Sequence, residues 1–347
     1  MVRFLAAVSA VVSLTALPAA ARTAEPAAQE ALLSTYGHAT LRPSKLAAFQ
    51  TSEFWGGEFT AASGETVRVF ISREYPEDPA TGQRWADFLA GLVHGAELGT
   101  VRTYLVPFRD IEPVCGRGAL ACYSAGQETI VALAENAPDG TSAEAVLAHE
   151  YGHHVANSRL NTPWAAVERG TKRWASYVNV CSRSRAGTLF PGDEDRFYRL
   201  NPGEGFAEAY RLLNERRAGR PEPPWDVVDQ SLYPDEEALR LLEQDVREPW
   251  TQNSTVTLRG SFASGRTRVR SFSVATRLDG LLAVRLTGPA QLRPRIVVSA
   301  RAGSRVLGRS RAGGRSVQTT VCGERAVRIR VERTRGLGAF RLAVSRP

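Results

Sequence analysis

The residue types best suited to chemistry lie in one short run, His149-Glu150-Tyr151-Gly152-His153. On an α-helix, residues four apart share a face, so both imidazoles can bind one metal ion at about 2 Å. Glu150 projects beside them, where it can take a proton from water and deliver it to a leaving amine. Because zinc suits imidazole ligands, this run predicts a hydrolase that uses one catalytic Zn²⁺.

The alternative interpretation is a pair of histidines on the surface of a helix. The chain has five histidines, and a chance match to this spacing is expected in on the order of one such sequence in a few hundred. We therefore favour a metal site. His154 is rotated off the face that His149 and His153 share, so we expect it to flank the site without binding the ion.

A catalytic zinc ion usually has a third protein ligand. The remaining histidines, His38 and His94, both lie upstream, so a downstream carboxylate must serve. Residues 201–210 read NPGEGFAEAY and place Glu204 and Glu208 one helical turn apart. This segment resembles the gluzincins, in particular lethal-factor-like toxins and secreted bacterial zinc peptidases. The resemblance implies that Glu204 is the third ligand and that Glu208 orients a ligand histidine.

Peptide hydrolysis also needs a group that stabilises the developing oxyanion, and several gluzincins use Tyr or His there. Tyr198 is our candidate for this group. The alternatives are that Tyr198 only packs in a loop, or that Tyr151 or Tyr210 lines the site in its place. In the zincin pattern, an edge strand above the active-site helix binds extended substrate. We expect residues 128–133 to form that strand.

Capping and hydrophobic patterns predict the elements that position these residues. Thr141 and Glu144 have the spacing of a capping box, so the metal-binding helix should begin there and end near Asn157. Further helices are expected over about 83–98, 163–178, 202–217 and 235–246, and strands over 66–72, 101–108 and 128–133. After residue 251, short alternating runs separated by glycine predict an all-β sandwich. The expected fold is thus an α+β zincin-like catalytic domain, with a small mixed sheet and helices, followed by a β-sandwich.

The first residues have the pattern of an export signal: Arg3, an apolar run from Phe4 to Leu17, and then small residues. We expect a signal peptide over 1–21, an N-terminal segment or short pro-region over 22–60, the catalytic domain over 61–250 and the sandwich over 251–347. No later stretch is apolar enough to cross a membrane. The sequence therefore predicts a secreted protein without a membrane span.

Four cysteines fit an oxidising compartment. Cys115 and Cys122 lie close together with glycines between them, which favours a local bridge and leaves Cys181 to pair with Cys322. Two free buried thiols remain an alternative, because sequence alone does not fix connectivity.

The net charge of +8 is unevenly distributed along the chain. Up to residue 250 there are 24 Lys and Arg against 33 Asp and Glu, a net −9, and after it 20 against 3, a net +17. The basic part resembles the bacterial pre-peptidase C-terminal β-sandwich, in Val321-Cys322-Gly323 and in residues 336–340. Its charge favours an anionic partner such as a cell-wall polymer, with an inert arginine-rich surface as the alternative. Nucleic acid is disfavoured because aromatic residues do not interleave the arginines.

Together these features predict a secreted zinc-dependent peptidase that acts on a peptide or protein substrate. One alternative is an extracellular zinc-containing binding protein with a vestigial site, and another is a cell-wall amide hydrolase anchored by the basic sandwich. A vestigial site would be expected to lose its general base, whereas Glu150 is present.

Overall fold

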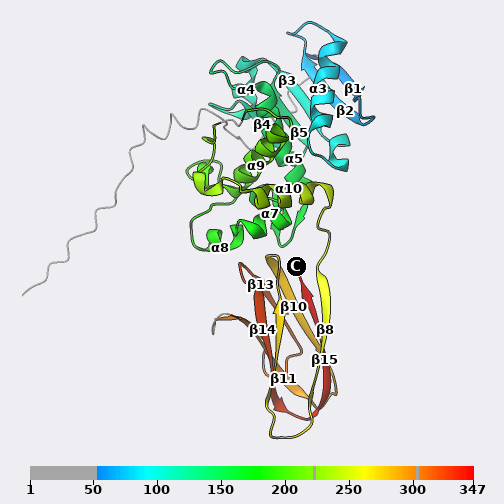
Figure 1. The fold of residues 1–347 in the computed structure, drawn as a ribbon, viewed down its shortest axis with the longest axis vertical. Coiled ribbons are helices and arrows are strands. Elements are labelled where there is room, and N and C mark those ends of the chain that lie inside the picture. Colours follow the sequence, from blue (N-terminus) through cyan, green and yellow to red (C-terminus); the bar gives the residue numbers. More distant parts are fainter. Residues whose placement is uncertain (1–52, 222–223, 302–304) are drawn as a thin grey trace, which may run out of the picture.

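The computed structural model describes residues 53–221, 224–301 and 305–347. The predicted signal peptide and residues 22–52 lie outside these ranges. The described residues form two separate hydrophobic cores, one drawn from residues 54–246 and one from residues 262–344. Figure 1 shows the two domains, one helical with a sheet and one made of strands, joined between α10 (Glu236–Arg247) and β8 (Ser254–Phe262).

A mixed five-stranded sheet organises the first domain, in the order β1-β2-β3-β5-β4. The strands are β1 (Phe54–Thr60), β2 (Thr66–Ser72), β3 (Arg102–Val106), β4 (Ala121–Ser124) and β5 (Thr129–Leu133). The middle three run parallel, and the two outer strands are antiparallel to their neighbours.

Two expectations about this sheet were wrong. The strand at 129–133 is internal, because β4 folds back in a hairpin and pairs with its outer side. All five residues of β5 are buried, as is typical of a strand covered on both faces. The first domain also begins before the expected boundary at residue 61, since β1 pairs with β2 along its whole length.

The first domain contains the helices α3 (Pro79–Gly91), α4 (Phe108–Cys115), α5 (Ala143–Asn157), α6 (Ala166–Arg169), α7 (Lys172–Tyr177), α8 (Val180–Arg185), α9 (Pro202–Arg217) and α10. The helix predicted over 202–217 is confirmed. The one predicted over 83–98 ends at Gly91, and the one predicted over 163–178 is two short helices, α6 and α7, neither of which starts at Pro163. Pro163 lies in the turn between β6 (Leu160–Asn161) and β7 (Trp164–Ala165), and Gly170, with a φ of +78°, separates α6 from α7.

Two four-stranded sheets pack around the second core. One has the order β13-β10-β15-β8 and the other β12-β11-β14-β9. Their strands are β8, β9 (Val269–Ala275), β10 (Gly280–Thr287), β11 (Arg293–Ala300), β12 (Val306–Arg309), β13 (Ser316–Val321), β14 (Ala326–Arg335) and β15 (Gly338–Arg346). In β14, Val327, Ile329 and Val331 are buried while Arg328 and Arg330 are exposed, so the predicted sandwich is confirmed.

Both expected disulfides are present, Cys115–Cys122 within the first domain and Cys181–Cys322 between the domains. In the described part of the chain, no helix has the length and apolar character needed to cross a bilayer.

Candidate metal centre

The helix that carries the candidate ligands is α5. Its N-cap is Ser142, whose Oγ accepts a hydrogen bond from the Ala145 N–H at 3.4 Å, so the predicted capping role of Thr141 was wrong. The helix lies against β4, β5 and α9 and is buried over almost its whole length. It therefore places His149, Glu150 and His153 inside the domain.

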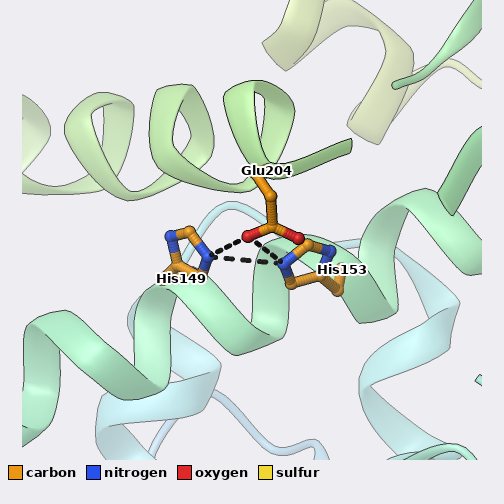
Figure 2. Close-up of side chains that lie close together, drawn as sticks. All are labelled: His149, His153 and Glu204. Carbon is orange, nitrogen blue, oxygen red and sulfur yellow. Dashed lines mark hydrogen bonds and ion pairs between the residues drawn. The ribbon is translucent and has the colours of Figure 1, made fainter. Parts of the chain in front are cut away.

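Three side chains converge between α5 and α9, as Figure 2 shows. His149 Nε2 lies 3.3 Å from His153 Nε2 and 3.3 Å from Glu204 Oε2, and His153 Nε2 lies 3.5 Å from that same oxygen. All three residues are buried. They form the one group of three possible metal ligands among the described residues.

This triangle fits a tetrahedral zinc ion. Bonds of about 2.0–2.1 Å at tetrahedral angles hold ligand atoms about 3.3–3.4 Å apart, close to the separations found here. Two imidazole nitrogens and a carboxylate oxygen are electron-rich atoms, so they are stable at this distance only with a cation or a proton between them. The donor set of two imidazoles and one carboxylate is one that zinc favours, and it leaves a fourth position for water or substrate.

Behind His149 lies a chain of buried polar contacts. His149 Nδ1 donates to Glu208 Oε2 at 3.0 Å; in the neutral ring, the form that can bind a metal, this leaves the lone pair of Nε2 facing the cluster. Arg211 Nε donates to the same oxygen at 2.9 Å, and Arg211 Nη2 donates to Glu208 Oε1. Arg211 also donates to Glu215 Oε1 at 3.3 Å. Glu204, Glu208, Arg211 and Glu215 thus form one polar stripe along α9.

The electrostatics of this chain follow from burial and charge. Burial acts to lower the pKa of His149, but Glu204 and Glu208 outweigh it and raise that pKa to about 10. Burial acts to raise the pKa of Glu208, but Arg211 and His149 hold it below its usual value. Glu208 is therefore an ionised acceptor that fixes the orientation of His149.

Close approach of α5 and α9 depends on Gly152. A Cβ at this position would lie 2.9 Å from Ala207 Cα and 3.2 Å from the Ala207 carbonyl oxygen, closer than packed atoms tolerate. Any side chain at residue 152 would push α9 away. The glycine inside the His-Glu-Tyr-Gly-His run thus sets the distance between the helix with two ligands and the helix with the third.

Glu150 is almost completely buried beside the cluster. Burial raises its pKa well above the usual value; the charge of His149 acts to lower it, and Glu204 and Glu194 act to raise it. A bound divalent cation would act in the same direction as His149 and favour the carboxylate.

Two further side chains from residues 194–198 interact with the cluster, Tyr198 by a hydrogen bond and Glu194 through its charge. Tyr198 Oη donates to Glu204 Oε2 at 2.7 Å, so the tyrosine predicted near the site does lie there, with its hydroxyl on the candidate ligand. Glu194 accepts from Asn201 Nδ2 at 3.1 Å. Burial and the charge of Glu204 raise the pKa of Glu194 to about 8. Sequence reasoning missed Glu194 because nothing in its spacing links it to the histidines.

The other candidates lie apart from the cluster. His154 donates from Nε2 to the Glu97 carbonyl oxygen at 2.8 Å and accepts from Tyr123 Oη at 3.0 Å, so it belongs to the core between α5 and the sheet. Tyr151 donates to Glu97 Oε1 at 3.4 Å, and Tyr210 donates to the Val93 carbonyl oxygen.

Sequence comparisons find no matching protein-family profile and no matching curated protein. Two solved structures are similar to part of the chain. One is PliG of Aeromonas hydrophila, a periplasmic inhibitor of g-type lysozyme, with 17% identity over 27% of this chain and 86% of PliG, at a TM-score of 0.23. The other is the pre-peptidase C-terminal domain of a Bacillus anthracis collagenase, with 17% identity over 26% of this chain and 88% of that domain, at a TM-score of 0.22. At these scores neither carries an argument about function.

Proposed function

We propose that this protein is a secreted zinc peptidase of the gluzincin type. The observation that carries the proposal is the triangle of His149 Nε2, His153 Nε2 and Glu204 Oε2, with separations of 3.3–3.5 Å that match the ligand spacing of tetrahedral zinc. Two disulfides fit an exported protein.

Each residue then has a separate role. A zinc ion supplies Lewis acidity at the site when it is bound. Glu150, on the same helix as both histidines, takes a proton from the attacking water on its carboxylate and returns it to the leaving amine. Glu208 holds the Nδ1–H of His149, so that Nε2 faces the ion. Tyr198 donates its single O–H to Glu204, and by turning that O–H from Glu204 to the substrate it is the candidate to stabilise charge on the substrate carbonyl oxygen.

The substrate is a peptide or protein. The basic sandwich supports an anionic envelope polymer as a further partner, since arginines such as Arg328 and Arg330 lie on its surface. The same architecture would also serve a hydrolase of cell-wall amides, or a binding protein that holds zinc without catalysis.

The decisive test compares the parent protein with Glu150→Gln on a mixed peptide library, with zinc content measured on both. We expect about one zinc per chain in each, and a kcat/KM about 10²–10⁴-fold lower in the variant because it lacks the proton acceptor. Glu144→Gln is the matched control, since Glu144 lies in the first turn of the same helix, away from the cluster, and should leave cleavage unchanged. Chelation should abolish cleavage and added zinc should restore it.

Equal cleavage by the parent and Glu150→Gln would exclude this mechanism. Stoichiometric zinc without cleavage by the parent would favour a zinc-containing binding protein. Cleavage only of cell-wall amides would favour a cell-wall amide hydrolase.

A further inference from the structure

A large cleft lies between the two domains, on the side where α7 and α10 face the sandwich. Its volume is about 1050 Å³, at the upper limit of typical ligand-binding sites. Its first-domain wall comes from α7 and α10, and its second wall from the start of β8, the β9–β10 and β13–β14 loops and the end of β15. The chain segment that links the domains contributes Trp250 and Gln252.

The lining is strongly basic. Five arginines line the cleft against one acidic side chain, Glu237: Arg173, Arg240, Arg277, Arg325 and Arg346. Three of these arginines already have carboxylate partners, Asp245, Glu237 and Asp279 respectively for Arg173, Arg240 and Arg325.

The other two arginines have no carboxylate partner among the described residues. Arg346 donates to Ser254 Oγ at 3.2 Å and to the Ala275 carbonyl oxygen at 2.6 Å, both neutral. Arg277 is exposed on the β9–β10 loop. The cleft therefore has a positive charge available for a ligand, and guanidinium groups pair well with carboxylate or phosphate.

The walls of the cleft are fixed relative to each other. The Cys181–Cys322 disulfide joins them. Arg325 donates to Asp279 at 2.8 Å within the sandwich and to Asn179 Oδ1 at 3.1 Å across the interface. Ser176 Oγ accepts from the Asp279 N–H at 2.9 Å. A cleft held in this way loses little conformational entropy when a ligand binds.

From this lining we infer that the interdomain cleft binds an oligosaccharide that carries acidic groups, either carboxylate or phosphate. The arginines would recognise the acidic groups, and Asn179, Gln244 and Gln252 offer amide donors and acceptors for hydroxyl groups. Tyr177 and Trp250 add aromatic surface. Nucleic acid fits less well, because the described residues of the cleft offer no more than two aromatic side chains, Tyr177 and Trp250, as stacking platforms for successive bases.

The test is calorimetric titration of the full chain with tetragalacturonate, with a phosphorylated maltotetraose and with neutral maltotetraose. We expect binding of at least one acidic sugar, weakened at least tenfold in the double variant Arg277→Gln/Arg346→Gln. The two acidic sugars distinguish carboxylate from phosphate recognition. The matched control is Arg259→Gln/Arg341→Gln, which removes the same charge from paired, exposed positions on β8 and β15 and should change affinity less than twofold.

The inference is overturned if neither acidic sugar binds, if the control weakens binding as much as the cleft variant, or if a tetradeoxythymidylate of similar charge binds more tightly. Arg277→Gln alone keeps the test decisive if the double variant does not fold. No cleft residue contacts the metal cluster, so failure here leaves the proposed peptidase function standing.

Discussion

At the scale of single residues, the proposed metal centre depends on a side chain that does not touch it. Arg211 is fully buried, and its guanidinium pairs with both oxygens of Glu208. Without that cation, Glu208 would be a buried carboxylate beside a second one, Glu204, and would tend to take up a proton. A protonated Glu208 is a poorer acceptor for His149, so the ligand would lose its orientation.

Replacing Arg211 should therefore weaken zinc binding, in addition to destabilising the fold through the buried carboxylates that lose their partner. We expect Arg211→Met to bind zinc about 10–100-fold less tightly than the parent, measured by competition with a chromogenic chelator. The Co²⁺-substituted variant should also show an altered visible spectrum, because the ligand geometry is less fixed. The zinc affinity of Arg211→Lys should lie between those of the parent and Arg211→Met, since lysine keeps the charge but lacks the bidentate geometry of the guanidinium.

Arg159→Met is the control for this experiment. Arg159 is another arginine whose side chain is nearly buried; it is paired with Glu97 at 2.8 Å and does not contact the ligand cluster. We expect it to lower the free energy of unfolding of the zinc-free protein without changing zinc affinity. Unchanged zinc affinity in folded Arg211→Met would contradict the positioning role.

At the scale of elements, the site is made by two helices in close contact. Two candidate ligands come from α5 and one from α9, so the spacing of the helices decides whether the three atoms meet. Glycine inside a helix costs about 1 kcal/mol relative to alanine, and its presence at residue 152 is explained by the contact with Ala207.

Gly152→Ala tests this contact. Helix propensity alone predicts a gain of about 1 kcal/mol in the free energy of unfolding, but overpacking against Ala207 should reverse it to a loss of about 1–3 kcal/mol. Zinc affinity should fall as well, because α9 moves away with Glu204. Gly91→Ala, at the end of α3, places its new Cβ in open space and should be neutral or slightly stabilising in urea unfolding. A stabilised Gly152→Ala with parental zinc affinity would show that the helices adjust without cost.

Sequence patterns predicted the elements well where local signals are strong. The alternation of residues 66–72 and the proline that starts residues 202–217 give their boundaries without tertiary information. The same patterns failed where contacts between distant residues determine the structure. The edge position of β4 depends on a hairpin whose residues show no strong strand pattern. The break at Gly170 depends on packing against Trp174 and Phe206.

The candidate site shows the same division. Fixed helical spacing brings His149, Glu150 and His153 together, so the sequence predicts their proximity. The approach of Glu204 depends on how two helices pack, and it was predicted only through the resemblance to gluzincins. Arg211 could have been noticed, since it follows Glu208 by three residues. Glu194 lies in an irregular segment, where sequence gives no direction for a side chain.

At the scale of the whole molecule, the domains meet around a buried lysine. Lys172 Nζ donates to the Thr162 carbonyl oxygen at 2.7 Å. A Cβ on Gly280 of the sandwich would lie 2.6 Å from Lys172 Nζ. Burial lowers the pKa of Lys172 to about 8, although Asp279 and Asp245 act to raise it. Folding thus brings an ammonium group into a site that disfavours its charge.

This gives a pH dependence of definite sign. Between about pH 8 and pH 10.5 the unfolded chain keeps the lysine proton that the folded chain has lost, so stability rises with pH over this window. In Lys172→Met this contribution is absent. The free energy of unfolding of the parent, relative to that of the variant, should therefore rise by on the order of 2–3 kcal/mol from pH 8 to pH 10.5. Urea unfolding of both proteins with the disulfides intact measures this difference. Parallel pH profiles for the two proteins would contradict this assignment.

The bridge between Cys181 and Cys322 joins positions 141 residues apart, on opposite sides of the short stretch from α10 to β8. That stretch lies inside a covalent ring closed by the disulfide. A protease that cuts it once opens the ring but does not divide the molecule, because the sulfur bond still holds the two fragments. Release of the sandwich then requires both a cut in the chain and reduction of the disulfide. In an oxidising compartment, where reductants are scarce, the two domains therefore stay covalently linked after a single cleavage.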